Sequence, residues 1–415
     1  MEQIHLTKTQ YCSFNKKVVF QITLPIILFT IITLQLVKNI SIKTPSNPII
    51  STSYINNNEE QGAPPTESDT RIKKCDLYSG DWIPNMDAPY YTNETCWVIQ
   101  EHQNCMKYGR PDTEFMKWRW KPNDCELPVF DPIKFFEIVK NKSMAFVGDS
   151  VARNQMQSLI CLLSRVEHPL DVSTSKDDNF KRWYYQSYNF TLVILWSPYL
   201  VKTIENDPNG RTGKTFWGLH LDEADDVWKD EIDKYEYVIV SAGQWFFRPL
   251  IYYEKGQFMG CRYCEIDNLT EYSLSFGFRN AFRTAFKAIL ERESFKGKVY
   301  MRTFVPGHFE GGEWDHGGDC LRKRPYKSNE VKVEGETLEL YTAQMEEFRE
   351  GQRLAQQRGL SLQLLDMTQI MLLRPDGHPS TYGRPANLTW PSDCVHWCLP
   401  GPIDSWSDFL LLMLD

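Results

Sequence analysis

Short apolar runs alternate with longer amphipathic segments from residue 143 to residue 366, and this alternation restricts the fold more than any other feature of the chain. The expected strands are residues 143–147, 191–196, 237–241, 298–305 and 361–366. The expected helices are residues 151–164, 274–293 and 338–358. Such alternation is typical of a mostly parallel β-sheet with helices on both faces. Because ligands of these sheets bind at the carboxyl ends of the strands, we expect functional residues in the turns that follow strands.

The first of these turns has the sequence Gly148-Asp149-Ser150. Gly148 permits a tight turn, and Ser150 then begins a helix, where free backbone N–H groups and the helix dipole favour a developing anion. A serine nucleophile and an oxyanion site can therefore share this turn. The alternative is that Asp149 or Ser150 only caps the helix, which is the commonest role of these residue types.

A second candidate site is the segment from Asp393 to Gly401, in which His396 lies between Cys394 and Cys398. A serine nucleophile needs a nearby base, and the base needs a carboxylate to fix its tautomer. His396 and Asp393 supply both from one loop, and the flanking cysteines could hold that loop in place. The alternative is a structural histidine inside a disulfide-bonded loop.

Two further segments are candidates for the surroundings of such a site. Gly243 and Gln244 follow the expected strand 237–241 and could donate hydrogen bonds to an oxyanion, although an ordinary turn explains them equally well. Residues 307–320 form a glycine-rich segment with several carboxylates and two histidines. We interpret this segment as a loop that lines the substrate-binding site, and a metal site is the alternative.

The N-terminal region predicts the compartment. Residues 18–37 carry no charged side chain and are long enough to cross a bilayer as a helix. Three lysines precede this run and two follow it, a bias that favours a cytosolic N-terminus. A cleaved signal peptide, the competing interpretation, would have a shorter apolar core followed by small residues. We therefore expect a cytosolic tail (1–17), a signal anchor (18–37), a flexible stem (38–74) rich in Ser, Thr, Asn and Pro, and a lumenal remainder.

Glycosylation sequons and cysteines agree with a lumenal location. Ten of the eleven cysteines follow the apolar run, an even number that suits disulfides. A zinc site built on Cys261, Cys264, Cys394 and Cys398 is the less favoured alternative, because the second pair lacks tight ligand spacing. N-x-S/T sequons occur close to the expected anchor at Asn39 and, further along, at Asn93, Asn141, Asn189, Asn268 and Asn387.

The lumenal part divides by composition. Residues 75–130 contain four cysteines and four tryptophans, and we expect a module stapled by disulfides rather than held by a core of its own. Its aromatic side chains could also bind sugar rings. Residues 131–415 contain the alternating pattern and form the expected α/β domain. The net charge of −8 argues against a general nucleic-acid-binding protein, which would carry a basic excess.

Together these motifs identify a family resemblance. They are the apolar segment 16–37, Cys-Asp-Leu-Tyr-Ser-Gly-Asp-Trp (75–82), Gly-Arg-Pro-Asp (109–112), Lys-Trp-Arg-Trp (117–120), Phe-Val-Gly-Asp-Ser (146–150) and Asp-Cys-Val-His-Trp-Cys-Leu-Pro-Gly (393–401). The chain resembles the plant trichome-birefringence-like family of polysaccharide O-acetyltransferases over nearly its whole length. One departure is Ser-Ala-Gly-Gln-Trp at residues 241–245, where relatives commonly have Asn-Ser-Gly-His-Trp.

The resemblance implies an SGNH/GDSL-hydrolase-like three-layer α/β/α fold and a single-pass type II protein of the Golgi membrane. It also implies that Ser150 is the nucleophile, His396 the base and Asp393 the acid that orients the base. An acetyl group would pass through acetyl-Ser150 onto a hydroxyl of a cell-wall polysaccharide. The donor would be acetyl-CoA or another acetylated intermediate, with no bound cofactor and no metal.

Several residues around the expected nucleophile are candidates for oxyanion or substrate contacts. The tetrahedral oxyanion would accept from the Ser150 and Gly243 N–H groups and from Arg153 or Gln244. The full set of candidates beside the catalytic three is Gly148, Asp149, Arg153, Gly243 and Gln244. The same catalytic residues could hydrolyse acetyl esters, so an acetylesterase is one alternative. A wall-polymer-binding protein without catalysis is another.

The resemblance also implies a disulfide pattern and a branch of the family. The implied pairs are Cys75–Cys125, Cys96–Cys161, Cys105–Cys398 and Cys320–Cys394, with Cys261–Cys264 as a local pair. The segment Gly-Cys-Arg-Tyr-Cys at residues 260–264 is similar to the branch that contains xyloglucan and mannan acetyltransferases rather than to the xylan branch.

Overall fold

A computed structural model describes residues 75–206, 216–264, 268–388 and 391–415. Its centre is a seven-stranded sheet with the order β13-β12-β9-β3-β6-β5-β4. The strands are β3 (Ser143–Gly148), β4 (Leu170–Asp171), β5 (Arg182–Tyr185), β6 (Phe190–Trp196), β9 (Tyr237–Val240), β12 (Lys298–Arg302) and β13 (Ser361–Leu365). Five neighbouring strands, from β13 to β6, are parallel. The sheet is nevertheless mixed, because β4 and β5, which the sequence pattern did not predict, run antiparallel at one edge.

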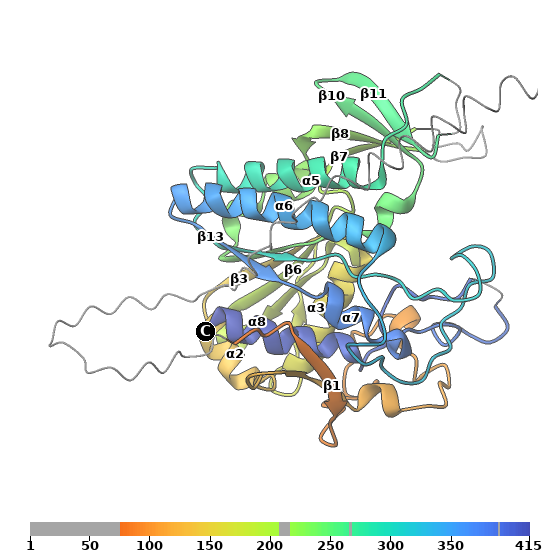
Figure 1. The fold of residues 1–415 in the computed structure, drawn as a ribbon. Coiled ribbons are helices and arrows are strands. Elements are labelled where there is room, and N and C mark those ends of the chain that lie inside the picture. The colour runs from red at the N-terminus through yellow and green to blue at the C-terminus, as the bar shows by residue number, and fades with distance from the viewer. Residues whose placement is uncertain (1–74, 207–215, 265–267, 389–390) are drawn as a thin grey trace, which may run out of the picture. The chain divides into compact units, whose positions relative to one another are not determined.

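Helices cover both faces of this sheet, as the resemblance implies (Figure 1). The α-helices are α2 (Pro132–Val139), α3 (Ser150–Leu163), α4 (Asp226–Lys229), α5 (Leu274–Leu290), α6 (Gly335–Gln357), α7 (Thr368–Leu372) and α8 (Trp406–Leu414). Helices α5 and α6 lie on one face, and α2, α3, α7 and α8 lie on the other. Side chains of β3 point alternately to the two faces. Met144 and Phe146 therefore belong to one apolar core, and Ala145 and Val147 to the other.

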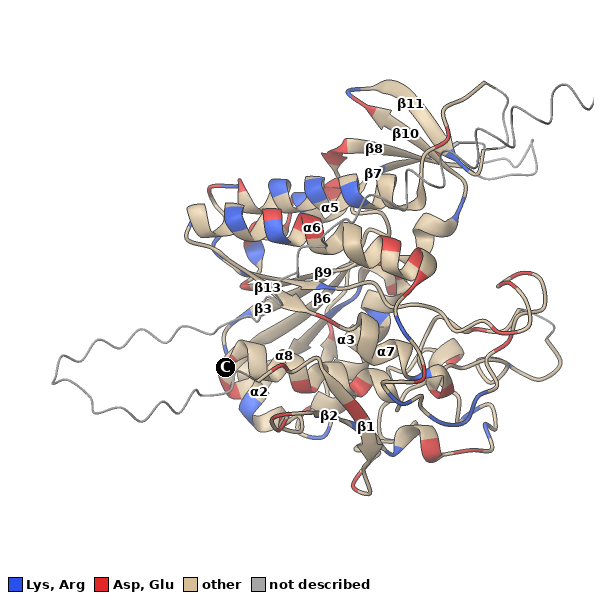
Figure 2. Cartoon of the chain, in the orientation of Figure 1, with Lys and Arg blue, Asp and Glu red and all other residues tan. Residues whose placement is uncertain are grey.

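Helices α5 and α6 pack side by side and present charged outer faces (Figure 2). Their inner faces are apolar, with Phe278 and Phe282 of α5 fully buried. On the outside, Arg283 of α5 binds Glu347 of α6 at 2.6 Å. This arrangement is that of an ordinary amphipathic helix pair over a sheet.

A second sheet of four strands was not predicted from the sequence. Its order is β11-β10-β8-β7, with β7 (Val201–Asn206), β8 (Phe216–Ala224), β10 (Leu250–Glu254) and β11 (Gln257–Arg262). Leu219 of β8 and Tyr252 of β10 are buried in the core that α5 shares with the central sheet. These strands therefore extend the layer of α5 rather than forming a separate domain.

Residues 75–130 have little regular structure of their own. They contain the antiparallel pair β1 (Gly80–Pro84) and β2 (Trp118–Pro122) and two short 3-10 helices. Their buried side chains join the core of α3 and α8. For example, the Trp82 indole N–H donates to the carbonyl of Ile370, 3.0 Å away. The segment is thus held by the large core and by disulfides, in agreement with the expectation that it has no core of its own.

The predicted tail, anchor and stem (1–17, 18–37 and 38–74) and the sequon at Asn39 lie outside the described residues. Within the part of the chain that is described, none of the helices is both long enough and apolar enough to span a bilayer. Asn141, Asn189, Asn268 and Asn387 are exposed, whereas Asn93 is half-buried. Glycosylation at these sequons stays a prediction.

Candidate active site

The turn between β3 and α3 places Ser150 at the first position of the helix. Asp149 is the N-cap: its carboxylate accepts from the N–H groups of Val151 (3.0 Å) and Ala152 (3.4 Å), and its carbonyl accepts from Arg153 N–H at 3.1 Å. Among the described residues the Ser150 N–H, by contrast, has no hydrogen-bond acceptor. The free donor of this helix terminus therefore belongs to the expected nucleophile itself.

Glycine at position 148 is required by a close approach of two chain segments. Its φ angle is +157°, and a Cβ atom there would lie 2.1 Å from the carbonyl oxygen of Ser241. The backbone of Ser241 also donates to Val147 at 3.0 Å. The turn after β3 and the turn after β9 are therefore neighbours at the carboxyl ends of the parallel strands, which is where ligands bind in such sheets.

His396 and Asp393 are hydrogen-bonded to each other, with 2.8 Å between His396 Nδ1 and Asp393 Oδ2. The second carboxylate oxygen accepts from the backbone N–H of His396 at 3.0 Å. Because the carboxylate can only accept, the proton of the neutral ring lies on Nδ1 and Nε2 carries the lone pair. Within the described residues, Nε2 is covered and has no hydrogen-bond partner. A ring held in this way is suited to act as a general base.

Asp393 and His396 change each other's pKa. Burial by itself would lower the pKa of His396, but the charge and hydrogen bond of Asp393 raise it above its usual value. Burial would likewise raise the pKa of Asp393, but His396 and the backbone N–H groups hold it well below its usual range. The two side chains retain 19% and 22% of their surface exposed, although His396 Nε2 itself is buried.

The loop that carries His396 is attached to the first turns of α3. The side-chain amide of Asn154 accepts from Trp397 N–H at 2.8 Å and donates to the Trp397 carbonyl at 3.3 Å. The charges of Asp149 and Arg153, on either side of Ser150, both act on the pKa of His396. These contacts place the His396 loop against the helix terminus that begins at Ser150. Among the described residues, His396 Nε2 makes no hydrogen bond to Ser150.

The other predicted oxyanion residues have partners of their own. The Gln244 amide donates to the carbonyl of Val305 at 3.0 Å. Arg153 binds the side-chain oxygen of Asn179, and its guanidinium lies 5.4 Å from the Trp196 ring. Gly243 lies against Phe304, so closely that a Cβ atom would be 2.4 Å from the ring. This contact fixes the position of the Gly243 backbone, which suits its N–H group to the role of a hydrogen-bond donor.

The described residues contain five disulfides: Cys75–Cys125, Cys96–Cys161, Cys105–Cys398, Cys261–Cys264 and Cys320–Cys394. These are the pairs that the resemblance implies. Because Cys394 and Cys398 bind different distant partners, the His396 loop is tied down on both sides. The cysteines of the alternative zinc site are thus all used in disulfides. Throughout the described ranges no cluster of three potential metal ligands occurs.

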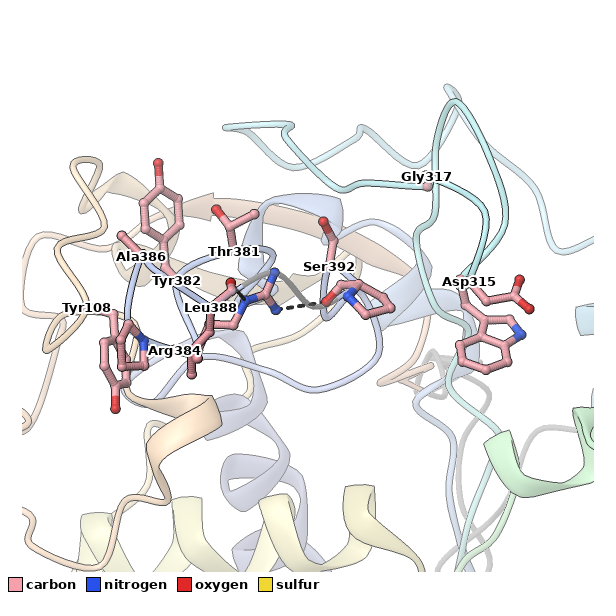
Figure 3. A pocket seen from close by; sticks show the side chains of 13 residues that line it. Tyr108, Asp315, Gly317, Thr381, Tyr382, Arg384, Ala386, Leu388 and Ser392 are labelled. Atoms are coloured by element: carbon pink, nitrogen blue, oxygen red, sulfur yellow. Dashed lines mark hydrogen bonds between the residues drawn. The ribbon is translucent and has the colours of Figure 1, made fainter. Parts of the chain in front are cut away.

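The glycine-rich segment 307–320 divides into a buried and an exposed part. His308 is buried, and the same burial lowers its pKa to about 4. Trp314 is 61% exposed and lines a groove of about 660 Å³. Figure 3 shows Asp315 and Gly317 of this segment across the groove from Tyr108 and Leu388. Ser392, the residue before Asp393, also lines it, so the groove borders the loop of the candidate active site.

Two family profiles match the chain. Residues 127–413 match the GDSL/SGNH-like acyl-esterase family found in Pmr5 and Cas1p, and residues 73–126 match the PMR5 N-terminal domain. Over 349 residues the chain is 58% identical to protein trichome birefringence-like 19 of Arabidopsis thaliana, covering 83% of this chain and 82% of that protein. The chain belongs to the trichome birefringence-like family.

Named acetyltransferases are among its relatives in this family. Xyloglucan O-acetyltransferase 4 of Populus trichocarpa is 41% identical, with 82% of this chain and 81% of that protein covered. Xyloglucan O-acetyltransferase 1 of Arabidopsis thaliana is 37% identical, with 91% and 89% covered. An α/β fold of the SGNH-like acyl-esterase type, with disulfides, is thereby shown for this trichome birefringence-like protein.

The structure of this family member also places beside His396 a second histidine, which the sequence analysis missed. The ring of His102, from the N-terminal segment, packs edge-on against His396 with 4.9 Å between ring centroids. Burial lowers the pKa of His102 to about 3, and the neighbouring His396 lowers it further. His102 is therefore neutral at pH 7 and adds no charge beside the base. Its proximity to Cys105, which is bonded to Cys398, was the one signal available in the sequence.

A second missed residue is His378, which supports the backbone of the His396 loop. Its Nδ1 lies 2.7 Å from the carbonyl oxygen of His396, to which it donates. The His378 ring also stacks on Trp397, with 4.1 Å between centroids. Burial lowers the pKa of His378 well below its usual value. His378 is thus a neutral positioning residue, and no local sequence pattern marked it.

Proposed function

We propose that this protein is a polysaccharide O-acetyltransferase that moves an acetyl group through acetyl-Ser150 onto hydroxyls of a plant cell-wall polysaccharide. The single observation that carries the proposal is the Asp393–His396 pair. It leaves a basic, unpartnered Nε2 in a loop attached to the helix that begins at Ser150. Membership of a family that contains named xyloglucan O-acetyltransferases supports the same conclusion.

In the first half-reaction, His396 Nε2 removes the Ser150 hydroxyl proton as Oγ attacks the acetyl carbonyl carbon of the donor. The N–H groups of Ser150 and Gly243 donate to the oxyanion that forms. The bond to the donor's leaving group then breaks, and His396 returns the proton to that group. The product is acetyl-Ser150.

In the second half-reaction, a sugar hydroxyl gives its proton to His396 and attacks the acetyl carbon. The bond to Ser150 Oγ breaks, and Oγ recovers the proton from His396. Two displacements of this kind predict ping-pong kinetics and an acyl-enzyme that can be trapped. Water in place of the sugar would give acetylesterase activity, so exclusion of water from acetyl-Ser150 separates the two functions.

The acceptor we favour is xyloglucan or mannan rather than xylan. The motif at residues 260–264 and the xyloglucan-specific names of the relatives support this choice. We place the protein in the Golgi membrane as a single-pass type II protein, with residues 18–37 as its anchor. Acetyl-CoA or another acetylated intermediate is the proposed donor.

The test uses the full-length chain in detergent and its Ser150→Ala variant. Each is incubated with an acetyl donor and with xyloglucan, glucomannan or xylan oligosaccharides, and product masses are read. We expect acetylated xyloglucan or mannan oligosaccharide from the parent chain and at least about 10³-fold less from Ser150→Ala. Ser164→Ala is the matched control, because Ser164 ends the same helix and its hydroxyl only donates to the Ile160 carbonyl.

Each outcome has a distinct meaning. Full transfer activity in Ser150→Ala would refute the assignment of the nucleophile. Free acetate without acetylated sugar, dependent on Ser150, would establish an esterase instead. A serine-reactive ester probe that fails to label the folded parent chain would favour the non-catalytic wall-polymer-binding alternative.

A further inference from the structure

The groove beside the His396 loop has a lining that is suited to a particular class of ligand. Its volume of about 660 Å³ lies within the range of small-molecule and oligosaccharide sites. It is formed by three parts of the chain that are far apart in the sequence: Tyr108, residues 314–318, and residues 381–388 with 391–392. Figure 3 shows that these segments face one another across an open depression.

One aromatic side chain of the groove, that of Trp314, is unusually accessible. Trp314 is 61% exposed, although an indole of this size is normally well buried. Tyr108 and Tyr382 also line the groove, and the Tyr108 hydroxyl is held by Glu101. An exposed aromatic face offers apolar area to the C–H face of a sugar ring, while nearby hydroxyls bind its polar edge. Thr381 and Ser392 supply such hydroxyls.

The charged side chains of the groove are already engaged. Arg384 donates to the carbonyls of Leu388 (3.2 Å) and Pro391 (2.8 Å). Asp315 lies 2.6 Å from the ring nitrogen of His316. An anionic ligand is best bound by cations that can turn toward it. The groove therefore favours an uncharged ligand over a polyanion or a nucleotide-containing donor.

The wall of the groove adjoins the segment that carries the candidate active site. Ser380 and Asp393 form two backbone hydrogen bonds, of 2.8 and 2.9 Å, so the groove wall and the carboxylate that orients His396 belong to one paired segment. On the other side, Gly383 approaches the backbone of His102, the residue whose ring packs on His396. A polymer in the groove would thus run past the loop that carries the base.

We propose that this groove holds the acceptor, as neutral sugar units of the polysaccharide chain that flank the unit to be acetylated, with one ring stacked on Trp314. This inference rests on the proposed function, because it assigns the acceptor of that reaction to a place. Its prediction, however, concerns binding and needs no turnover.

The experiment measures binding of a neutral xyloglucan oligosaccharide to the full-length Ser150→Ala chain by calorimetry. In this background we expect Trp314→Ala to raise Kd about tenfold, the loss of one well-packed aromatic contact. Trp314→Phe retains an aromatic ring and should recover most of the affinity. This result would separate the loss of the aromatic contact from a general disturbance of the loop. The matched control is Trp97→Ala, because Trp97 is 57% exposed but does not line the groove.

The proposal would be overturned by an unchanged Kd in Trp314→Ala, or by an acidic oligogalacturonide that binds more tightly than the neutral oligosaccharide. Competition of the oligosaccharide by coenzyme A would also overturn it, since the groove would then belong to the donor. Binding that depends on Trp314, together with a parent chain that transfers no acetyl group, would support the groove while refuting the proposed function.

Discussion

At the scale of single residues, the proposed chemistry depends on how Asp393 changes the tautomer and the pKa of His396. The carboxylate fixes the Nδ1 tautomer and raises the pKa of the ring. The other histidines nearby, His102, His308 and His378, have lowered pKa values because they are buried. Burial alone therefore gives neutral rings, and only the carboxylate neighbour makes one of them a stronger base.

This leads to a prediction for Asp393→Asn. The base must be neutral to accept a proton, so the rate of the parent chain should rise with pH through the raised pKa of His396. Without the carboxylate, the pKa of His396 falls, and this rising limb should move to lower pH. The plateau should also fall, by about 10³- to 10⁴-fold, because the tautomer is no longer fixed. A pH–rate profile measures both effects, and an unshifted limb in Asp393→Asn would contradict the role given to this carboxylate.

At the scale of secondary-structure elements, α3 brings the two halves of the site together. Its N-terminus carries Ser150, and one turn later Asn154 holds the backbone of Trp397 through two hydrogen bonds. The helix is buried along most of its length. It can therefore act as a rigid support for the His396 loop.

Replacing Asn154 by Ala should uncouple the loop from the helix. The buried N–H and carbonyl of Trp397 would lose their partners, which costs about 2–4 kcal/mol of unfolding free energy. The acetyl-transfer rate constant should fall more than the affinity for the acceptor changes, since the base is displaced and the groove is not. Gln155→Ala is the control, because the amide of the neighbouring Gln155 has no partner within the described residues. Equal effects of the two substitutions on the rate constant would refute this positioning role.

Helix α8 carries a carboxylate with the opposite behaviour. Burial raises the pKa of Asp408 to about 8, although its carboxylate accepts from Phe130 N–H at 2.7 Å. Between the unfolded pKa near 4 and the folded value, the folded state binds more protons, so this residue lowers stability as pH rises. We expect the melting temperature of Asp408→Asn minus that of the parent chain to increase from pH 5 to pH 8. A constant difference between the two chains over this range would contradict the raised pKa.

At the scale of the whole molecule, a disulfide joins the N-terminal segment to the His396 loop. Cys105–Cys398 closes a loop of 293 residues, whereas Cys261–Cys264 spans only three. Chain entropy predicts about 6 kcal/mol for the long link and less than about 2 kcal/mol for the short one. The long link also ends two residues after His396.

The corresponding experiment compares two double variants. Cys105→Ala/Cys398→Ala should lower the melting temperature by at least several degrees and reduce acetyl transfer strongly. Cys261→Ala/Cys264→Ala should change both much less. Thermal unfolding and product mass provide the measurements, and the reverse order of effects would show that the N-terminal segment does not support the site.

The local features of this protein were predictable from its sequence. The alternating pattern predicted the parallel core strands to within a few residues, and the Gly-Asp-Ser turn predicted a helix starting at Ser150. The pairing of Asp393 with His396 was also accessible, because three residues separate them in one loop. Periodicity, turn chemistry and short spacing are physical properties of neighbouring residues.

Which distant segments meet became clear only from the three-dimensional structure. Asn154 and Trp397 are 243 residues apart. Tyr108 carries no local signal that it lies beside the groove, and for His102 the only signal was the nearby Cys105. The second sheet was missed for the same reason, since its strands are defined by packing on α5 rather than by their own pattern. Contacts of this kind depend on shape, burial and disulfide closure across the whole chain, which no short stretch of sequence contains.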